Sequence, residues 1–401
     1  MNMCATTNRF ICWEDIDFRT AEKHVKKLQK RIAKAYENQR YDVVINLQHQ
    51  IVHSFYAKAL AVKRVTTNKG RHTSGVDGIT WNTSEEKFEA IKFLKRRGYK
   101  PMPLRRVYIP KGNKKLRRLS IPTMKDRAMQ TLYKFALEPI AEITADECSY
   151  GFRPNRCAKD VVIQCCDILE EYPSVEWIAK VDIKSCFDNI SHEWLLNHIF
   201  MDKVVLKKFL KSPYVDKSII HPTVQGIPQG GAISCVICNM TLDGLEDLIA
   251  ERCGCDVHIL RYADDILVLG TFKPFFVRGV IQIIQDFLSI RNLSLAENKK
   301  VIARVNDGFT FLGWEISRKE GRVQAVPTRK NIDGLIAKIK EVLVNEKQLT
   351  HQKQSIALKL IIRGWLNYYS TVAPEQSLCD VANEVLACTD QWGFDLSQFI
   401  M

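Results

Sequence analysis

The stretch "RYADDILVLG", residues 261–270, decides the fold, because it sets two adjacent carboxylates, Asp264 and Asp265, between apolar runs. The longer run "VHILRYADDILVLG" predicts two strands around a tight acidic turn. Neighbouring carboxylates repel each other, so a bound cation is one way to hold them together. An isolated acidic pair more often caps a turn than binds a metal, so other segments must decide between these interpretations.

A third carboxylate ends a separate strand pattern. The segment "VEWIAKVDIKSCFDNI" (175–190) alternates into a strand that ends on Asp182. Mg²⁺ takes oxygen ligands from one or two carboxylates and completes its shell with water and phosphates. Two such ions can activate an attacking hydroxyl and stabilise a leaving group in phosphoryl transfer. Asp182, Asp264 and Asp265 are therefore the candidate metal ligands.

The composition favours a nucleic-acid partner. The 401 residues are enough for two or three domains, and 59 Lys and Arg against 45 Asp and Glu give a net charge of +14. Such an excess favours an anionic partner, most simply nucleic acid. No apolar run approaches the roughly 18 residues of a membrane span, and the first residues lack the apolar stretch of a signal peptide. We therefore expect no membrane partner, a cytoplasmic location and reduced cysteines.

The cysteines leave two interpretations open. Cys235 and Cys238 have the spacing of half a zinc site, whereas Cys253 and Cys255 do not match the second half. The first pair lies in an apolar run, where positions three apart share a helix face. Buried thiols are therefore favoured over a zinc site.

Periodicity and turn residues predict the remaining elements. Apolar residues at helical spacing predict two helices in 20–65, and the pattern becomes helical again from about 317. Two short strand signals around a basic turn predict a hairpin in 101–123. A glycine-rich loop at 225–234 leads into an apolar helix. Residues 68–81 read as a loop in which Gly75 and Gly78 supply positive φ.

Together, these segments resemble a known family. "YADD" resembles the Y-x-D-D signature of reverse transcriptases, "VDIKSCFDNI" their first catalytic motif, and "QGIPQGGAIS" their nucleotide-pocket loop. Other segments are similar to group II intron-type enzymes in particular, and all fall in the family's order between about residues 20 and 371. They are "SGVDGITW", "PLRRVYIPKGNKKLRRLSIPTMKDRAMQ", "SYGFRPNRCAKD", "FTFLGWEI" and "IIRGWLNYYS".

The resemblance implies an α+β fold, the right-hand polymerase of fingers, palm and thumb. It implies a helical N-terminal extension with RNA-binding helices and a loop over residues 1–90. Fingers and palm would occupy 91–316, and a helical thumb or maturase-like domain 317–401.

The resemblance also implies the roles of the acidic residues. Asp182 and Asp264 would ligate two Mg²⁺ ions, with Mn²⁺ as an alternative, and the carbonyl of Ile183 would assist. Asp265 would complete the cluster, either as a looser metal ligand or by tuning the neighbouring carboxylate of Asp264. These groups would lower the pKa of a primer 3′-hydroxyl and offset charge on the triphosphate.

Five further residues match nucleotide-binding positions of the family. Lys111 and Arg118 would clamp the triphosphate, which suits an ammonium and a forked guanidinium. Phe187 lies at the sugar gate, where a ring would exclude a ribose 2′-hydroxyl. Gln229 would lie under the incoming base or the template. Lys299 matches a late-palm lysine that can protonate pyrophosphate, with the adjacent Lys300 as the alternative. Without the resemblance, Phe187 would be interpreted as an aromatic residue of the core, and Lys111 and Arg118 as solvated basic side chains.

The partners implied are an RNA template, deoxynucleotides and a complementary DNA product. Basic residues crowd the first predicted helix and form either a solvated or a phosphate-binding face. The candidates are Lys23, Lys27, Lys30, Arg31 and Lys34. Compared with other group II intron proteins, the chain stops soon after "NYYS" and lacks a paired C-x-x-C zinc pattern. We therefore expect a domesticated antiviral-defence enzyme that copies a structured noncoding RNA. The alternative is an intron-encoded maturase that assists splicing and retrohoming.

Three rival functions remain open: an RNA-binding splicing cofactor, an RNA-directed RNA polymerase, and protein-primed or template-independent synthesis. The intact acidic residues favour catalysis, and Phe187 favours a DNA product. Tyr368 and Tyr369 are candidate protein primers, although their spacing favours a helical core. The sequence does not specify an oligomeric state.

Overall fold

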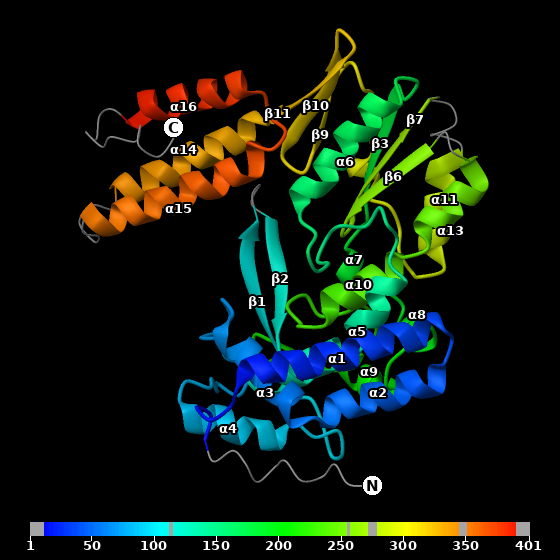
Figure 1. Ribbon diagram of the computed structural model, residues 1–401, viewed down its shortest axis with the longest axis vertical. Coiled ribbons are helices and arrows are strands. Elements are labelled where there is room, and N and C mark those ends of the chain that lie inside the picture. The colour runs from blue at the N-terminus through cyan, green and yellow to red at the C-terminus, as the bar shows by residue number, and fades with distance from the viewer. Residues whose placement is uncertain (1–11, 112–114, 255–256, 272–278, 345–350, 390–401) are drawn as a thin grey trace. The chain divides into compact units, whose positions relative to one another are not determined.

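The computed structural model describes residues 12–111, 115–254, 257–271, 279–344 and 351–389, and the chain divides into two compact units (Figure 1). The chain passes between these units several times. Unit 1 comprises Met1–Glu147, Ile183–Leu245 and Ile284–Leu295, and unit 2 comprises Cys148–Asp182, Glu246–Ile283 and Ala296–Met401.

Unit 1 begins with three helices rather than the two predicted for residues 20–65: α1 (Phe18–Glu37), α2 (Tyr41–His53) and α3 (Phe55–Thr67). Ser54 ends α2 with extended backbone, and its hydroxyl accepts a hydrogen bond from the Ala57 N–H at 3.4 Å, which caps α3. The prediction was wrong because the apolar stripe continues across this break. All three helices pack against α5 (Met124–Ile143), most of which is buried.

The predicted loop at 68–81 is confirmed, but Gly75 serves a different purpose from Gly78. Gly78 has a φ of +70°, as expected, whereas Gly75 has no positive φ. A Cβ on Gly75 would lie 2.6 Å from Thr123 Cα, so close backbone approach requires the glycine. The buried guanidinium of Arg127 donates to the carbonyls of Gly70 and Thr73 and thereby fixes the loop to α5.

The hairpin predicted at 101–123 is confirmed as β1 (Leu104–Lys111) and β2 (Lys115–Ile121), although turn residues 112–114 lie outside the described residues. β1 also pairs in parallel with β4 (Tyr214–Asp216), which pairs with β5 (Ile219–His221). The sheet order is therefore β2-β1-β4-β5. Tyr108 on β1 donates its hydroxyl to Asp216 on β4, which links the two hairpins by side chains as well.

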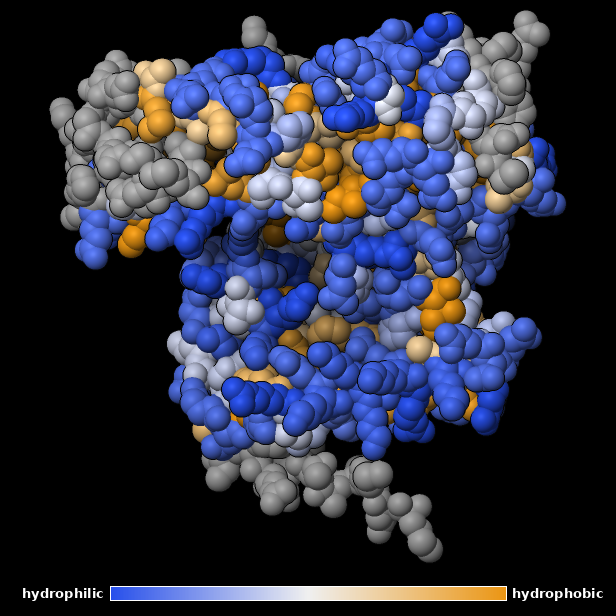
Figure 2. Space-filling model, turned by 45° about the horizontal axis from the view of Figure 1, so that its top comes forward, coloured by the Kyte–Doolittle hydropathy of each residue, from blue (hydrophilic) through white to orange (hydrophobic). Residues whose placement is uncertain are grey.

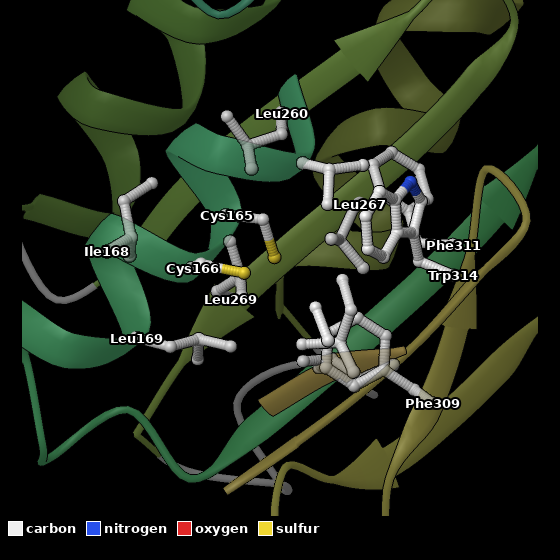
Figure 3. Close-up of a cluster of buried hydrophobic side chains, with 14 of the residues drawn as sticks. Cys165, Cys166, Ile168, Leu169, Leu260, Leu267, Leu269, Phe309, Phe311 and Trp314 are labelled. Atoms are coloured by element: carbon white, nitrogen blue, oxygen red, sulfur yellow. The ribbon is translucent and has the colours of Figure 1, made fainter. Parts of the chain in front are cut away.

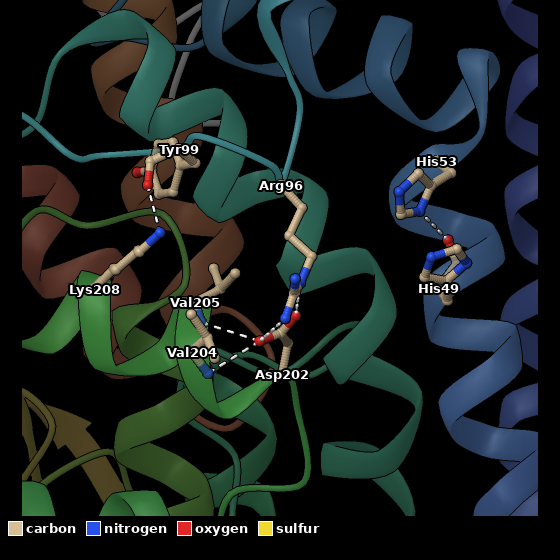
Figure 4. A network of polar contacts seen from close by, with 8 residues as sticks. All are labelled: His49, His53, Arg96, Tyr99, Asp202, Val204, Val205 and Lys208. Atoms are coloured by element: carbon tan, nitrogen blue, oxygen red, sulfur yellow. Dashed lines mark hydrogen bonds and ion pairs between the residues drawn. The ribbon is translucent and has the colours of Figure 1, made fainter.

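Short helices complete unit 1, and a polar network joins two of its loops (Figure 4). Asp202 caps α9 by accepting from the N–H groups of Val204 and Val205 at 3.0 and 3.2 Å, and it pairs with Arg96. Lys208 on α9 donates to the Tyr99 carbonyl at 2.6 Å. The helices are α4 (Ser84–Phe93), α7 (Cys186–Asn189), α8 (His192–His198), α9 (Lys203–Leu210) and α10 (Ser234–Leu242), with α13 (Ile281–Ser289) running in from unit 2.

Unit 2 is built on a four-stranded antiparallel sheet with the order β6-β7-β3-β8. β3 (Trp177–Asp182) ends at the predicted aspartate, and β6 (Val257–Tyr262) and β7 (Asp265–Gly270) confirm the two strands around the acidic turn. β8 (Val301–Arg304) forms the other edge. The helices α6 (Ala158–Glu171) and α11 (Leu245–Cys253) belong to this unit, apart from Leu245.

A second sheet corrects the prediction that the chain is helical from residue 317. Strands β9 (Phe309–Phe311), β10 (Trp314–Lys319) and β11 (Arg322–Pro327) form an antiparallel meander, and helices begin only at α14 (Arg329–Val344). Glu320 and Gly321 connect β10 and β11 with φ values of +50° and +76°, the pattern of a two-residue hairpin turn. Helices α15 (His351–Tyr369) and α16 (Glu375–Thr389) follow, and α14 packs on both.

One hydrophobic core joins α6, the four-stranded sheet and the β9–β11 sheet (Figure 3). Trp314 is fully buried and heads the largest side chains of this core. The ring of Tyr369 on α15 lies 4.7 Å from that of Trp314, which ties the following helices to the strands. Cys165 and Cys166 lie in the same core as thiols.

The surface and the remaining cysteines carry less information. Hydrophilic side chains cover most of the face seen in Figure 2, with apolar side chains showing between them. No described helix is long and apolar enough to cross a membrane.

Cys238 is buried on α10 and its sulfur lies 3.7 Å from that of Cys186. Cys255, in the second candidate zinc pair, lies outside the described residues.

Candidate active site

The acidic turn is a tight connection between β6 and β7. Tyr262 pairs directly with Asp265, so only Ala263 and Asp264 form the turn. Ala263 is buried and has a φ of +56°, a conformation that costs a non-glycine residue on the order of 1 kcal/mol. Such local strain persists only where surrounding contacts impose it, and it is typical of functional turns.

The segment at 148–151 supplies those contacts. The Arg261 N–H donates to the Cys148 carbonyl and the Tyr150 N–H donates to the Arg261 carbonyl, both at 2.9 Å. This short parallel bridge runs along β6 and ends with Gly151 against the acidic turn. A Cβ on Gly151 would lie 2.4 Å from the Ala263 nitrogen and 3.0 Å from the Ala263 Cβ. The "SYGFRPN" segment therefore holds the turn in place through a contact that only glycine allows.

Gly151→Ala is expected to displace the acidic turn, because the clashing atoms belong to the backbone and cannot rotate away. We expect a loss of catalytic rate on the order of 10- to 100-fold, since a displacement of about 1 Å has that effect. The free energy of unfolding should fall by about 1–3 kcal/mol. Gly334→Ala on α14 is the matched control: its Cβ meets nothing within 4 Å, and it should leave activity unchanged. Equal activity of both variants would contradict the supporting role.

Two carboxylates face each other across the sheet. Asp182 at the end of β3 pairs in register with Asp265 at the start of β7, and Asp264 precedes Asp265 in the turn. Burial raises the pKa of Asp265, the charge of Asp264 raises it further, and Asp182 acts in the same direction. Negative charge is therefore concentrated where the end of β3 lies beside the β6–β7 turn.

Two lysines oppose this negative charge. Lys299 on the short 3₁₀ helix η3 (Glu297–Lys299) donates from Nζ to Asp182 Oδ2. Lys180 lies two residues before Asp182 and donates to the Thr310 carbonyl at 3.1 Å. Both lysines lower the pKa of Asp265, against the effect of burial.

The donor set fits a hard divalent cation. Asp182, Asp264 and Asp265 offer only oxygen ligands, which Mg²⁺ and Mn²⁺ accept. Burial first, and then the neighbouring negative charges, raise the pKa of Asp265. Among the described residues, no three His, Cys, Asp or Glu side chains are close enough to hold a metal ion by themselves. Magnesium sites of one or two carboxylates completed by water and phosphates do not need such a group. The predicted backbone ligand, Ile183, is buried and bridges to Leu295.

The turn between β9 and β10 lies in the segment "FTFLGWEI", at "FLGW" (311–314). Leu312 and Gly313 have φ values of +46° and +89°, and Phe311 pairs with Trp314 around them. The hydroxyls of Tyr368 and Tyr369 donate to the carbonyls of Leu312 and Gly313 at 2.8 and 3.1 Å. These tyrosines therefore brace the turn, which weakens the alternative that they are protein primers.

The predicted nucleotide-binding residues, apart from Lys299, belong to unit 1. Arg118 on β2 is paired with Asp188 on α7, at 2.9 Å from Nη2 to Oδ2. Lys111 is the last residue of β1, and its side chain lies outside the described atoms. Phe187 on α7 accepts at its carbonyl from the Ile227 N–H at 2.7 Å. The Gln229 carbonyl accepts from the Ser120 N–H at 2.8 Å, so the glycine-rich loop is bonded to both α7 and β2.

Gly226 explains how closely this loop approaches α7. Its φ is +79°, and an added Cβ would lie 2.5 Å from the Asp188 carbonyl oxygen. The sequence indicated a glycine-rich loop at 225–234, and the structure shows that Gly226 in this loop lies at a tight backbone contact.

The predicted RNA-binding residues all lie on α1 and are exposed. Their spacing follows the helix repeat, opposite the apolar residues that pack on α5. The acidic N-cap Asp17 precedes this basic face. The residues are Lys23, Lys27, Lys30, Arg31 and Lys34.

Sequence reasoning missed four residues that contact the candidate segments, two in each unit. Asp188 and Lys180 both lie in the segment 175–190. The alternation that indicated a strand ending on Asp182 also places Lys180 on the same face of that strand as Asp182. Gly151 and Gly226 were visible as glycines, but only the folded backbone shows what each one touches.

Comparisons with known proteins agree over most of the chain. Three family models match: the N-terminal domain of reverse transcriptase at residues 13–94, Reverse transcriptase (RNA-dependent DNA polymerase) at 109–316, and the group II intron maturase-specific domain at 332–392.

Individual relatives cover different shares of the chain. Protein YkfC of Escherichia coli is 30% identical over 68% of this chain and 84% of its own length. The Group II intron-encoded protein LtrA of Lactococcus lactis is 36% identical over 48% of this chain, but that match spans 33% of LtrA. Maturase-like protein 1 of Euglena gracilis is 25% identical over 87% of this chain and 76% of its length. The chain thus belongs to the reverse transcriptases of the group II intron type, RNA-directed DNA polymerases with a right-hand polymerase fold.

Proposed function

We propose that this reverse transcriptase copies a bound RNA into complementary DNA at the acidic cluster of Asp182, Asp264 and Asp265. The observation that carries the proposal is the register of β3 and β7, which sets Asp182 directly opposite Asp265 beside Asp264. The family's polymerisation depends on a divalent metal. When bound, that metal would lower the pKa of the primer 3′-hydroxyl and offset charge on the triphosphate.

The residues of this chain take complementary roles in the proposal. Asp182, Asp264 and the Ile183 carbonyl would hold two Mg²⁺ ions, and Asp265 would complete the cluster. Lys111 and Arg118 would bind the triphosphate, which requires Arg118 to exchange Asp188 for phosphate. Phe187 would exclude ribonucleotides, and Gln229 would contact the base or the template.

Three predicted regions organise these roles: RNA-binding helices and a loop in 1–90, fingers and palm in 91–316, and a thumb or maturase-like domain in 317–401. The exposed basic face of α1 favours contact with RNA phosphates. Structured RNA is bound largely through phosphate, 2′-hydroxyl and shape contacts, which this face suits.

For the biological role, we propose first the intron type, in which the chain binds an intron RNA, assists its splicing and copies it. The match to the maturase-specific domain and the intron-encoded relative LtrA favour this role. The antiviral-defence role and a separate noncoding RNA template stay predictions, as does a cytoplasmic location.

The deciding experiment sequences the RNA and DNA that co-purify with the tagged full chain, beside the Asp264→Ala/Asp265→Ala variant. We expect one enriched RNA in both preparations and its complementary DNA only with the wild type. An enriched RNA that is an intron would support the intron role, and a separate noncoding RNA the defence role. Complementary DNA of equal yield from the variant would contradict catalysis at this cluster.

A further inference from the structure

The ammonium group of Lys299 is bonded to the carboxylate of Asp182, which the proposed function assigns as a metal ligand. Its Nζ donates to Asp182 Oδ2, and the Asp182 side chain is only 18% exposed whereas that of Lys299 is 49% exposed. Asp182 also faces Asp265 across the sheet. A half-buried carboxylate beside another acid needs a positive charge, and here the chain itself provides one.

The backbone builds this contact rather than leaving it to a long side chain. The Ala296 N–H donates to the Asp182 carbonyl at 2.8 Å, and the Lys299 N–H donates to the Ala296 carbonyl at 2.9 Å. The turn that carries Lys299 is therefore bonded to the main chain of the residue whose side chain Lys299 binds. Because the main chain already holds these two residues together, their ion pair costs less conformational entropy than an ion pair between two independent side chains.

The next residue provides an internal contrast. Lys300 carries the same charge one position along, but its Nζ lies 2.8 Å from Glu297 Oε2, within its own turn. Of these two adjacent lysines, one bonds to Asp182 and the other to a surface glutamate. The local structure thus assigns one ammonium to the acidic cluster.

We propose that Lys299 is an exchangeable counter-ion of Asp182, which bonds to this carboxylate in the metal-free protein and is displaced when a divalent cation binds. Oδ2 cannot accept the ammonium and ligate a cation in the same geometry, so the two compete for it. The inference rests on the proposed function, since it takes Asp182 as a metal ligand. A lysine that acts only on the nucleotide phosphates would have no effect on metal binding in the absence of nucleotide.

The experiment measures Mn²⁺ binding to the full chain by electron paramagnetic resonance, without nucleotide or nucleic acid. Lys299→Met keeps the length of the side chain and removes its charge. We expect its Kd for Mn²⁺ to fall about fivefold, which corresponds to losing a modest ion pair. Lys300→Met, the matched control, removes the same charge and should change Kd by less than about twofold. Lys299→Arg restores the charge and should return Kd toward the wild-type value.

Two outcomes would overturn the proposal: equal Mn²⁺ affinity in wild type and Lys299→Met, or an equal gain in both methionine variants, which would indicate a general charge effect. Asp182→Asn separates this failure from failure of the proposed metal site. If Asp182→Asn removes Mn²⁺ binding while Lys299→Met changes nothing, only the counter-ion role fails. If Asp182→Asn retains full Mn²⁺ binding, the metal site fails and the counter-ion role fails with it.

Discussion

Asp264→Asn is expected to lower the rate of DNA synthesis by on the order of 10³-fold. The carboxamide keeps the shape of the side chain in the two-residue turn but removes the negative charge that binds a divalent cation. The measurement is single-nucleotide incorporation on a defined RNA template with a DNA primer, under saturating deoxynucleotide. Because the substitution preserves the turn, the affinity for the primed template should stay within a few-fold of the wild type.

The matched control for this prediction is Asp307→Asn, an exposed acid of unit 2 that lies before β9. It removes the same charge from the same unit and should leave the rate of incorporation unchanged. If Asp264→Asn retained more than about a tenth of the wild-type rate, a direct catalytic role for this carboxylate would be wrong.

Trp314→Ala is expected to lower the free energy of unfolding by about 3–5 kcal/mol. The indole is fully buried, and its ring lies 4.7 Å from Tyr369 and 5.7 Å from Tyr368. Its removal leaves a cavity where β10 meets α15, and it also loosens the tyrosines that brace the "FLGW" turn. Native stability is typically about 5–15 kcal/mol, so the loss should be visible in denaturant and as reduced activity at 37 °C.

Leu360→Ala on α15 tests whether this loss reflects burial rather than apolar character. Leu360 is 69% exposed, and its replacement should change stability by less than about 0.5 kcal/mol. A similar shift of the denaturation midpoint in both variants would contradict the structural role of Trp314.

The sequence predicted the elements whose signal is local. Alternation found β3, and the apolar runs around the acidic pair found β6, β7 and the turn between them, because both signals depend on neighbours within a few residues. The break at Ser54 was missed because an apolar stripe can pass through a helix junction without losing its period. The β10–β11 hairpin was missed because much of it is exposed and charged, although Glu320 and Gly321 carried a turn signal.

The chemistry of the site was less predictable than its residues. The family resemblance indicated Arg118 and Lys299, but not that each is paired with an acid distant in sequence, 70 and 117 positions away. Such pairs form only when tertiary structure brings the segments together. The same holds for Gly151, whose requirement for glycine depends on the backbone of Ala263.

The repeated passage of the chain between its two units has a consequence during synthesis on the ribosome. Unit 1 is complete only after the chain has been synthesised as far as Leu295. In unit 2, β3 can form its hydrogen bonds with neighbouring strands only after β7 and β8 have been synthesised. In a nascent chain, α1, α2 and α3 can pack on α5 early, whereas the apolar faces of α6 and β3 stay uncovered until the strands from β6 onward have been made. Contacts between distant segments also slow folding. The same arrangement means that no single cut in the gene separates the two units into intact fragments.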